Sequence, residues 1–208
     1  MIAGGLAGLA RLVSGATGRW VGCRPEPRQR IYFANHTSHL DFVVLWATLP
    51  PTLRRLTRPV AAEDYWGAGL RHYVITRVFD GVLVPRGSGR AAERSAQVDA
   101  ARRTVERVAA ALGREHSLII FPEGTRGPGP EVAPFKSGLY HLCALRPDVE
   151  LVPVYLENLN RILPKGELLP VPFLSSVTFG VPIRVGAEES KAAFLERARA
   201  AVTALRRP

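Results

Sequence analysis

The chain has 208 residues, of which 47% are hydrophobic and 22% are charged, so its length and composition predict one globular domain and argue against a disordered chain or a coiled coil. It holds no apolar run long enough for an ordinary membrane-spanning helix, and its two cysteines are too few for a disulfide framework and favour a reducing compartment. Basic residues outnumber acidic ones by 28 to 18, and the net charge of +10 suits an anionic partner such as nucleic acid, anionic lipid or a phosphorylated substrate.

Residues 1–22 are rich in glycine and alanine and predict an N-terminal amphipathic helix. Their apolar residues recur at steps of three and four, which places on one helical face Leu6, Leu9, Val13, Ala16 and Trp20. Two interpretations of this helix stay open: it lies in a membrane interface, or it packs on the rest of the chain. We expect residues 23–208 to form the main domain.

Short apolar runs alternate with helical patterns through the rest of the chain. Strands are expected at 31–34, 59–62, 82–84, 118–121, 149–156, 175–179 and 183–185. Helices are expected at 40–49, 65–78, 90–112, 136–145 and from about residue 187 onward. This alternation predicts an α/β fold, a single domain with a mainly parallel central sheet flanked by helices. In such sheets ligands bind beyond the carboxyl ends of the strands, so the loops that follow these ends are the first candidates for a site.

The segment after the first of these strands carries a histidine and a carboxylate five residues apart, His36 and Asp41. His36 falls in the turn between strand and helix, and Asp41 falls in the first turn of the helix. A carboxylate that folds back across this turn can bond one imidazole nitrogen and leave the other to act as a base. The pair therefore indicates a catalytic dyad that removes a proton from a hydroxyl group.

Two other interpretations fit the same stretch. Ser38 and Asp41 have the spacing of a capping box, with Ser38 as the N-cap residue. This structural role is compatible with the catalytic one, because a carboxylate has two oxygens. Zinc or iron could instead be bound by His36, His39 and Asp41, but the other histidines stand apart and complete no ligand set. We therefore expect no metal at this site.

The loop after 118–121 contains Glu123, Gly124, Thr125 and Arg126, and parallel strands would place it at the same sheet edge as His36. Gly124 lets backbone N–H groups come close to a ligand, and Arg126 can hold a phosphate with two hydrogen bonds. Glu123 can accept a hydrogen bond from a substrate hydroxyl or hold Arg126 in place. The competing interpretation is an ordinary surface turn, in which glycine and proline are common.

Two further cations are candidates for binding an anion at this edge. Arg86 follows the expected strand at 82–84 and Pro85. Lys136 opens an expected helix, whose free N–H groups also favour an anionic ligand. The alternatives are a solvated loop arginine and an ordinary helix start after Pro134.

In this order the motifs resemble the glycerolipid acyltransferase family, which includes bacterial 1-acyl-glycerol-3-phosphate acyltransferases. The resemblance rests on H-x-x-x-x-D at 36–41 and on F-P-E-G-T-R at 121–126. It is extended by Phe135, Lys136 and Gly138 and by Val152-Pro153-Val154, so that it covers about residues 31 to 154. The chain departs from the family at Pro85, where an aspartate often precedes the arginine, and in its short hydrophobic N-terminal part.

The resemblance implies transfer of a fatty acyl group from an acyl-CoA or acyl-carrier-protein thioester to the sn-2 hydroxyl of 1-acyl-glycerol-3-phosphate, which gives phosphatidic acid. It implies that His36 is the general base and that Asp41 orients it. It places the phosphate of the acceptor at Arg126, in a pocket shaped by Glu123 and Gly124. A second phosphate-binding arginine is implied at Arg86.

The resemblance implies no cofactor beyond the acyl donor. The partners it implies are a lysophospholipid, acyl-CoA or acyl carrier protein, and an anionic membrane surface, so we expect a peripheral protein on the cytoplasmic face of the cell membrane. Acylation of another lysolipid, such as a lyso-amino-acid lipid, and metal-dependent hydrolysis remain as alternatives. Nucleic acid is not expected as a partner, because no binding motif is present and only 8% of the residues are aromatic.

Overall fold

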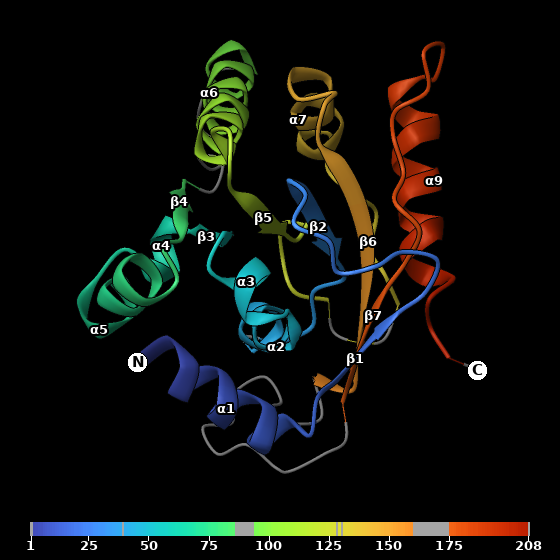
Figure 1. Ribbon diagram of the computed structural model, residues 1–208. Helices are drawn as coiled ribbons and strands as arrows, with labels where there is room; N and C mark the ends of the chain where they lie inside the picture. The colour runs from blue at the N-terminus through green and yellow to red at the C-terminus, as the bar shows by residue number, and fades with distance from the viewer. Residues whose placement is uncertain are drawn as a thin grey trace.

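The computed structural model describes residues 2–38, 40–85, 94–127, 129, 131–159 and 175–207. In this part of the chain, seven strands form one sheet (Figure 1). Their order across the sheet is β1-β7-β6-β2-β5-β3-β4. In chain order the strands are β1 (Thr17–Trp20), β2 (Arg30–Ala34), β3 (Thr57–Ala62), β4 (Val82–Val84), β5 (Ser117–Ile120), β6 (Glu150–Glu157) and β7 (Ser176–Phe179).

Helices are present in the expected ranges, but a short helix at Pro51–Arg54 was not expected, and the helix expected at 65–78 is divided into separate segments. They are α1 (Ile2–Ser14), α2 (Asp41–Thr48), α3 (Pro51–Arg54), α4 (Glu63–Trp66), α5 (Gly69–Tyr73), the π-helical turn η1 (Val74–Val78), α6 (Arg94–Leu112), α7 (Gly138–Leu145) and α9 (Lys191–Thr203). α2 ends just before Pro50, because the residue that precedes a proline is driven out of the helical conformation. Of the helix expected at 90–112, residues 90–93 lie outside the described part of the chain.

β2 lies at the centre of the sheet, between β6 and β5, and runs parallel to both. β3 runs parallel to β5 and β4, and β1 runs parallel to β7. Among the described strands, the antiparallel pair is β6 with β7. The prediction of a mainly parallel α/β sheet is therefore confirmed. Because β2, β3, β4 and β5 point the same way, the loops that follow them meet at one edge, which we call the carboxyl edge.

Helices cover both faces of the sheet (Figure 1). One face packs against α1, α2, α3 and η1, and the other packs against α6, α7 and α9. Successive side chains of a strand point to opposite faces, so Tyr32 and Ala34 enter the first layer while Ile31 and Phe33 enter the second. All four are fully buried. β2 is thus fixed in the middle of three layers, and the loop that follows it starts from a rigid position.

The N-terminal helix is present but shorter than predicted. α1 ends at Ser14, and Gly15 follows with a φ of 55°, in the left-handed region that glycine adopts readily. Residues Thr17–Trp20 then form β1, which pairs with β7. Trp20 stacks on Phe179 with ring centroids 4.0 Å apart. The prediction of one helix through residue 22 is therefore wrong beyond Ser14, because the glycine ends the helix and pairing with β7 extends the chain.

α1 packs on α2 through one side and leaves its other side open. Ala7 is buried in this contact, whereas Leu9 and Leu12 are 57% and 80% exposed. Among the described residues, no helix combines the length and the hydrophobicity needed to cross a membrane. The helix therefore rests on the domain, and Leu6 of the predicted apolar face packs in that contact. The exposed apolar side holds Leu9, which belongs to the predicted face, and Leu12, which does not. The division of the chain at residue 22 stays a prediction.

The strand expected at 183–185 is reduced to a single bridge between Ile183 and Leu151. The N–H of Gly180 donates to Pro153 and that of Ile183 donates to Leu151, but Pro182 between them has no N–H to donate. The chain then enters α9, whose N-cap residue Ser190 accepts the N–H of Ala193 over 3.2 Å.

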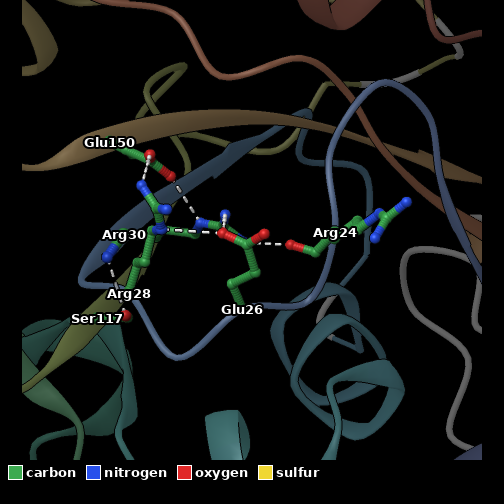
Figure 2. A network of polar contacts seen from close by, with 6 residues as sticks. All are labelled: Arg24, Glu26, Arg28, Arg30, Ser117 and Glu150. Carbon is green, nitrogen blue, oxygen red and sulfur yellow. Dashed lines mark hydrogen bonds and ion pairs between the residues drawn. The ribbon is translucent and has the colours of Figure 1, made fainter.

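An ion pair fixes the start of β2 at the edge opposite the carboxyl edge (Figure 2). Arg30 is 2% exposed, and its Nε donates over 3.0 Å to Oε2 of Glu150, the first residue of β6. Its Nη1 donates to the carbonyl oxygen of Arg24 over 2.7 Å. Its backbone N–H donates over 3.0 Å to Oγ of Ser117, the first residue of β5. These bonds tie together the first residues of three neighbouring strands.

Candidate active site

His36 and Asp41 lie together at the carboxyl edge, where β2 leads into α2. The imidazole Nδ1 of His36 is 2.8 Å from Oδ2 of Asp41. The side chain of Asp41 is fully buried, while that of His36 is 22% exposed. Since Nδ1 faces the carboxylate, Nε2 is the nitrogen left to meet a substrate. The structure thus brings the two predicted residues together.

The carboxylate of Asp41 also shapes the loop that carries His36. Its Oδ2 accepts the backbone N–H of Thr37 over 2.6 Å and that of Ser38 over 2.9 Å. The bond to Ser38 is one half of the expected capping box, but Oγ of Ser38 accepts the N–H of Leu40 (3.3 Å) in place of that of Asp41. The prediction of Ser38 as the N-cap residue is wrong, because α2 begins at Asp41 and its N-cap residue is Leu40. One oxygen therefore serves both the imidazole and the loop, and Oδ1 has no hydrogen-bond partner among the described residues.

The loop after β5 holds the backbone of His36 from its other side. The N–H of His36 donates to Oε1 of Glu123 over 2.7 Å, and its carbonyl oxygen accepts the N–H of Gly127 over 2.8 Å. The ring of Phe121 stacks on the imidazole with centroids 4.2 Å apart and planes 20° apart. Because β2 and β5 are neighbours, the two predicted motifs form one site.

Glu123 is a support for this loop in the structure. It is 4% exposed, and its Oε2 accepts the N–H of Ala133 over 3.1 Å in addition to the bond from His36. Burial raises the pKa of its carboxyl group, and the two N–H donors oppose that rise. Of the two roles that the sequence left open for Glu123, the ion pair with Arg126 is absent among the described residues, and the bond to a substrate hydroxyl stays a prediction. The carboxylate instead bonds the backbone N–H groups of His36 and Ala133.

Two cations stand at the site without a carboxylate partner in the described chain, Arg126 and Lys136. Arg126 is half-buried and directly precedes Gly127, which bonds the backbone of His36. Lys136 lies across Gly124, where a Cβ atom would be 2.6 Å from its Nζ. Gly124 has a φ of 70°, and Thr125 beside it is exposed. An anion at this edge would therefore meet positive charge that no described side chain neutralises.

Two candidates from the sequence cannot be placed. Arg86 and His39 lie outside the described residues. Within the residues that are described, no group of three or more His, Cys, Asp or Glu side chains is arranged to hold a metal ion.

A family model described as Acyltransferase matches residues 23–157. The chain belongs to this family. The match spans the loop after β2, the loop after β5 and Lys136, so the whole described site lies within the acyltransferase domain.

Among curated proteins, the chain is 30% identical over 156 residues to a 1-acyl-sn-glycerol-3-phosphate acyltransferase of Cocos nucifera, which covers 74% of this chain and 46% of that protein. It is 28% identical over 181 residues to a protein of the same name from Limnanthes douglasii, with 86% and 58% covered. It is 30% identical over 172 residues to a protein named Taffazin from Dictyostelium discoideum, with 76% and 54% covered. The chain thus spans about half the length of the curated relatives it matches.

Among solved structures, the acyltransferase domain is similar to the crystal structure of the 1-acyl-sn-glycerophosphate (LPA) acyltransferase PlsC from Thermotoga maritima. The TM-score is 0.70, and the alignment covers 98% of this chain and 76% of that one. The sequence identity is 19%, so this likeness supports the fold.

Two residues of the site were not singled out from the sequence, Asn35 and Phe121. Asn35 is 2% exposed, and its side chain bonds the backbone of Leu156 in β6. Phe121 flanks the second motif and supplies the ring that stacks on His36. The sequence signal for Asn35 was a polar residue at the end of an apolar strand. Its partner Leu156 lies 121 residues further along the chain, and only the order of the strands brings the two together.

Proposed function

We propose that this acyltransferase moves a fatty acyl group from an acyl-CoA or acyl-carrier-protein thioester to the sn-2 hydroxyl of 1-acyl-glycerol-3-phosphate and so makes phosphatidic acid. The observation that carries the proposal is the His36–Asp41 pair, set at one sheet edge beside Arg126 and Lys136, which have no carboxylate partner among the described residues. The names of the plant relatives support the choice of acceptor.

His36 acts as the general base in this proposal. Its Nδ1 is engaged by Asp41, so Nε2 takes the proton of the acceptor hydroxyl as the hydroxyl oxygen attacks the thioester carbonyl. The carboxylate of Asp41 stabilises the imidazolium that results. When the tetrahedral intermediate collapses, the C–S bond breaks, and the imidazolium returns the proton to the leaving thiolate. The proton taken from the hydroxyl thus ends on the thiol, the electron pair of the C–S bond leaves with the sulfur, and the reaction needs no further cofactor.

Arg126 and Lys136 bind the phosphate of the acceptor. A guanidinium group can hold two phosphate oxygens with parallel hydrogen bonds, whereas an ammonium group acts as a compact charge. Arg86, which follows β4 and Pro85 in the sequence, lies outside the described residues, and we propose it as a further phosphate ligand.

The exposed apolar side of α1 and the net charge of +10 support binding to an anionic membrane. We propose a peripheral protein that meets its lipid acceptor at the cytoplasmic face of the cell membrane. The second candidate acceptor is another lysolipid, such as a lyso-amino-acid lipid, whose hydroxyl the same His36–Asp41 pair could deprotonate.

The test is release of free thiol from palmitoyl-CoA, with and without lysophosphatidic acid, by the wild type, by His36→Ala and by His141→Ala. His141 is an exposed histidine on α7 and serves as the matched control. We expect release that depends on the acceptor, loss of about 10²- to 10⁴-fold in His36→Ala, and no loss in His141→Ala. The melting temperature of His36→Ala should stay near that of the wild type, because the bonds to Glu123 and Gly127 use backbone atoms.

Equal release by the wild type and His36→Ala would overturn the role of His36. If palmitoyl-CoA gives no release, palmitoyl-acyl-carrier-protein and other lysolipids are tested in the same format. Absence of acyl transfer with every donor and acceptor would overturn the proposed function itself.

A further inference from the structure

Asn35 is a buried amide directly before His36. Asn35 is 2% exposed and is the first residue after β2. A buried amide is costly unless its oxygen and its nitrogen both find hydrogen-bond partners. Here both partners belong to one residue of β6, Leu156.

The side chain of Asn35 extends the pairing of β2 with β6 beyond the end of the backbone ladder. The last backbone pair in that ladder is Ala34 with Val154. Nδ2 of Asn35 donates to the carbonyl oxygen of Leu156 over 3.0 Å, and Oδ1 accepts the N–H of Leu156 over 2.7 Å. The orientation of the amide is unambiguous, because a flipped amide would set donor against donor and acceptor against acceptor.

The loop that carries His36 is therefore held on both sides. On the β5 side, Glu123 and Gly127 bond the N–H and the carbonyl oxygen of His36. On the β6 side, the described residues hold the loop through the hydrogen bonds between the amide of Asn35 and the backbone of Leu156. The backbone of His36 thus lies between two strands that are not adjacent to each other.

We propose that Asn35 is a positioning residue for acyl transfer: its amide bonds to Leu156 fix the backbone from which His36 meets Asp41 and the substrate. This inference rests on the proposed function of His36. It adds a role that neither motif requires, because the amide touches no substrate and acts only through the histidine. Displacing a reacting group by about 1 Å can cost about 100-fold in rate, so a loosened loop lowers kcat while phosphate binding at Arg126 persists.

The test compares Asn35→Asp and Asn35→Ala with the wild type and with the control Thr57→Ala. Thr57 is also buried, at 2% exposed, and its Oγ1 donates to the Leu53 carbonyl oxygen over 2.8 Å at the start of β3. The control therefore removes a buried hydrogen bond at the opposite edge of the sheet. Kinetics with palmitoyl-CoA and lysophosphatidic acid are measured well below each melting temperature.

We expect both Asn35 variants to lose about 10- to 100-fold in kcat with KM changed by less than about threefold, while Thr57→Ala keeps its kcat. In Asn35→Asp a carboxylate oxygen faces the carbonyl oxygen of Leu156, and only the protonated acid can donate to it. Burial raises the pKa of such a carboxyl group, so the ratio of Asn35→Asp to wild-type kcat should rise as the pH is lowered. The same ratio for Asn35→Ala should stay flat.

A second readout does not depend on activity. In nuclear magnetic resonance spectra, the proton on Nδ1 of His36 should give a downfield signal in the wild type and in Thr57→Ala, because that nitrogen bonds Asp41. The signal should shift or broaden in both Asn35 variants. Unchanged kcat together with an unchanged signal would overturn the positioning role. A wild type that transfers no acyl group would instead sink the proposed function, and the signal alone would then decide the role of Asn35.

Discussion

The side chain of Arg126 is half-buried at the carboxyl edge and has no carboxylate partner among the described residues. Arg126→Ala should raise KM for lysophosphatidic acid about tenfold or more, because a charge-assisted pair of hydrogen bonds to phosphate is lost. The value of kcat should change much less, since His36 and Asp41 are untouched. Steady-state kinetics with varied acceptor at saturating palmitoyl-CoA measure both parameters.

The matched control for this change is Arg103→Ala, which removes the same charge from an exposed position on α6. Its KM should equal that of the wild type. A second control replaces the acceptor with monoacylglycerol, which has no phosphate, so Arg126→Ala should use it as well as the wild type does. An equal rise in KM for both acceptors would show that Arg126 does not bind the phosphate.

Individual residues show how much of the site could be predicted from the sequence. The pairing of His36 with Asp41 is local, five residues apart across one turn, and could be predicted from the spacing. The roles of Glu123 and Asn35 could not, because each depends on a backbone group far along the chain: His36 for Glu123, and Leu156 for Asn35. The backbone group that each of these side chains bonds depends on the order of the strands in the sheet, and spacing in the sequence does not encode that order.

At the scale of secondary-structure elements, α1 offers a membrane contact that can be tested. Leu9 and Leu12 are mostly exposed, and each leucine that enters an apolar phase contributes about 1.5–3 kcal/mol when fully buried. The double variant Leu9→Ser, Leu12→Ser should therefore bind phosphatidylglycerol vesicles at least about tenfold more weakly. Sedimentation with vesicles measures the effect.

The control for the α1 variant is Leu145→Ser on α7, which covers the other face of the sheet (Figure 1). Leu145 is 52% exposed, so the change removes a similar apolar surface. Weaker binding in the control, or unchanged binding in the α1 variant, would contradict the proposed contact. Phosphatidylcholine vesicles show how much of the binding is electrostatic.

Most elements could be predicted because their signals are local. Proline before α3 and glycine after α6 marked helix boundaries, and apolar runs of three to eight residues marked the buried strands. The short helix α3 was not predicted, and neither was β1, whose four residues Thr17–Trp20 are largely exposed on an edge and carry no strand pattern of their own. The pairing with β7 that defines this strand comes from a segment more than 150 residues later.

For the whole molecule, the ion pair between Arg30 and Glu150 is the contact whose loss should cost most. Glu150→Ala removes the nearer carboxylate partner of Arg30, whose side chain is 3% exposed, and leaves the guanidinium a 4.0 Å contact to the more exposed Glu26. We expect the free energy of unfolding to fall by about 3 kcal/mol, because the buried guanidinium loses its short hydrogen-bonded partner and the distant Glu26 compensates its charge poorly. Urea denaturation followed by circular dichroism measures this loss.

Asp148→Ala is the control for this change, because its pair with Arg146 involves a carboxylate that is 60% exposed. Such exposed pairs contribute about 0.2–1 kcal/mol, so its loss should be small. The double variant Arg30→Met, Glu150→Leu should recover much of the stability of the wild type, since no buried charge is left unpaired. Equal losses in Glu150→Ala and Asp148→Ala would show that burial of Arg30 does not matter.

The contacts around His36 also bear on how the enzyme is made. Glu123 follows His36 by 87 residues, and Leu156 follows Asn35 by 121. During synthesis, the loop with His36 leaves the ribosome long before either support exists, and it settles only after β5 and then β6 have docked beside β2. If His36 is the base, as proposed, the nascent chain should carry no working base until its central sheet is assembled. On this proposal, acyl transfer would require a fully assembled sheet, and a truncated translation product that lacks β6 should be inert towards thioesters.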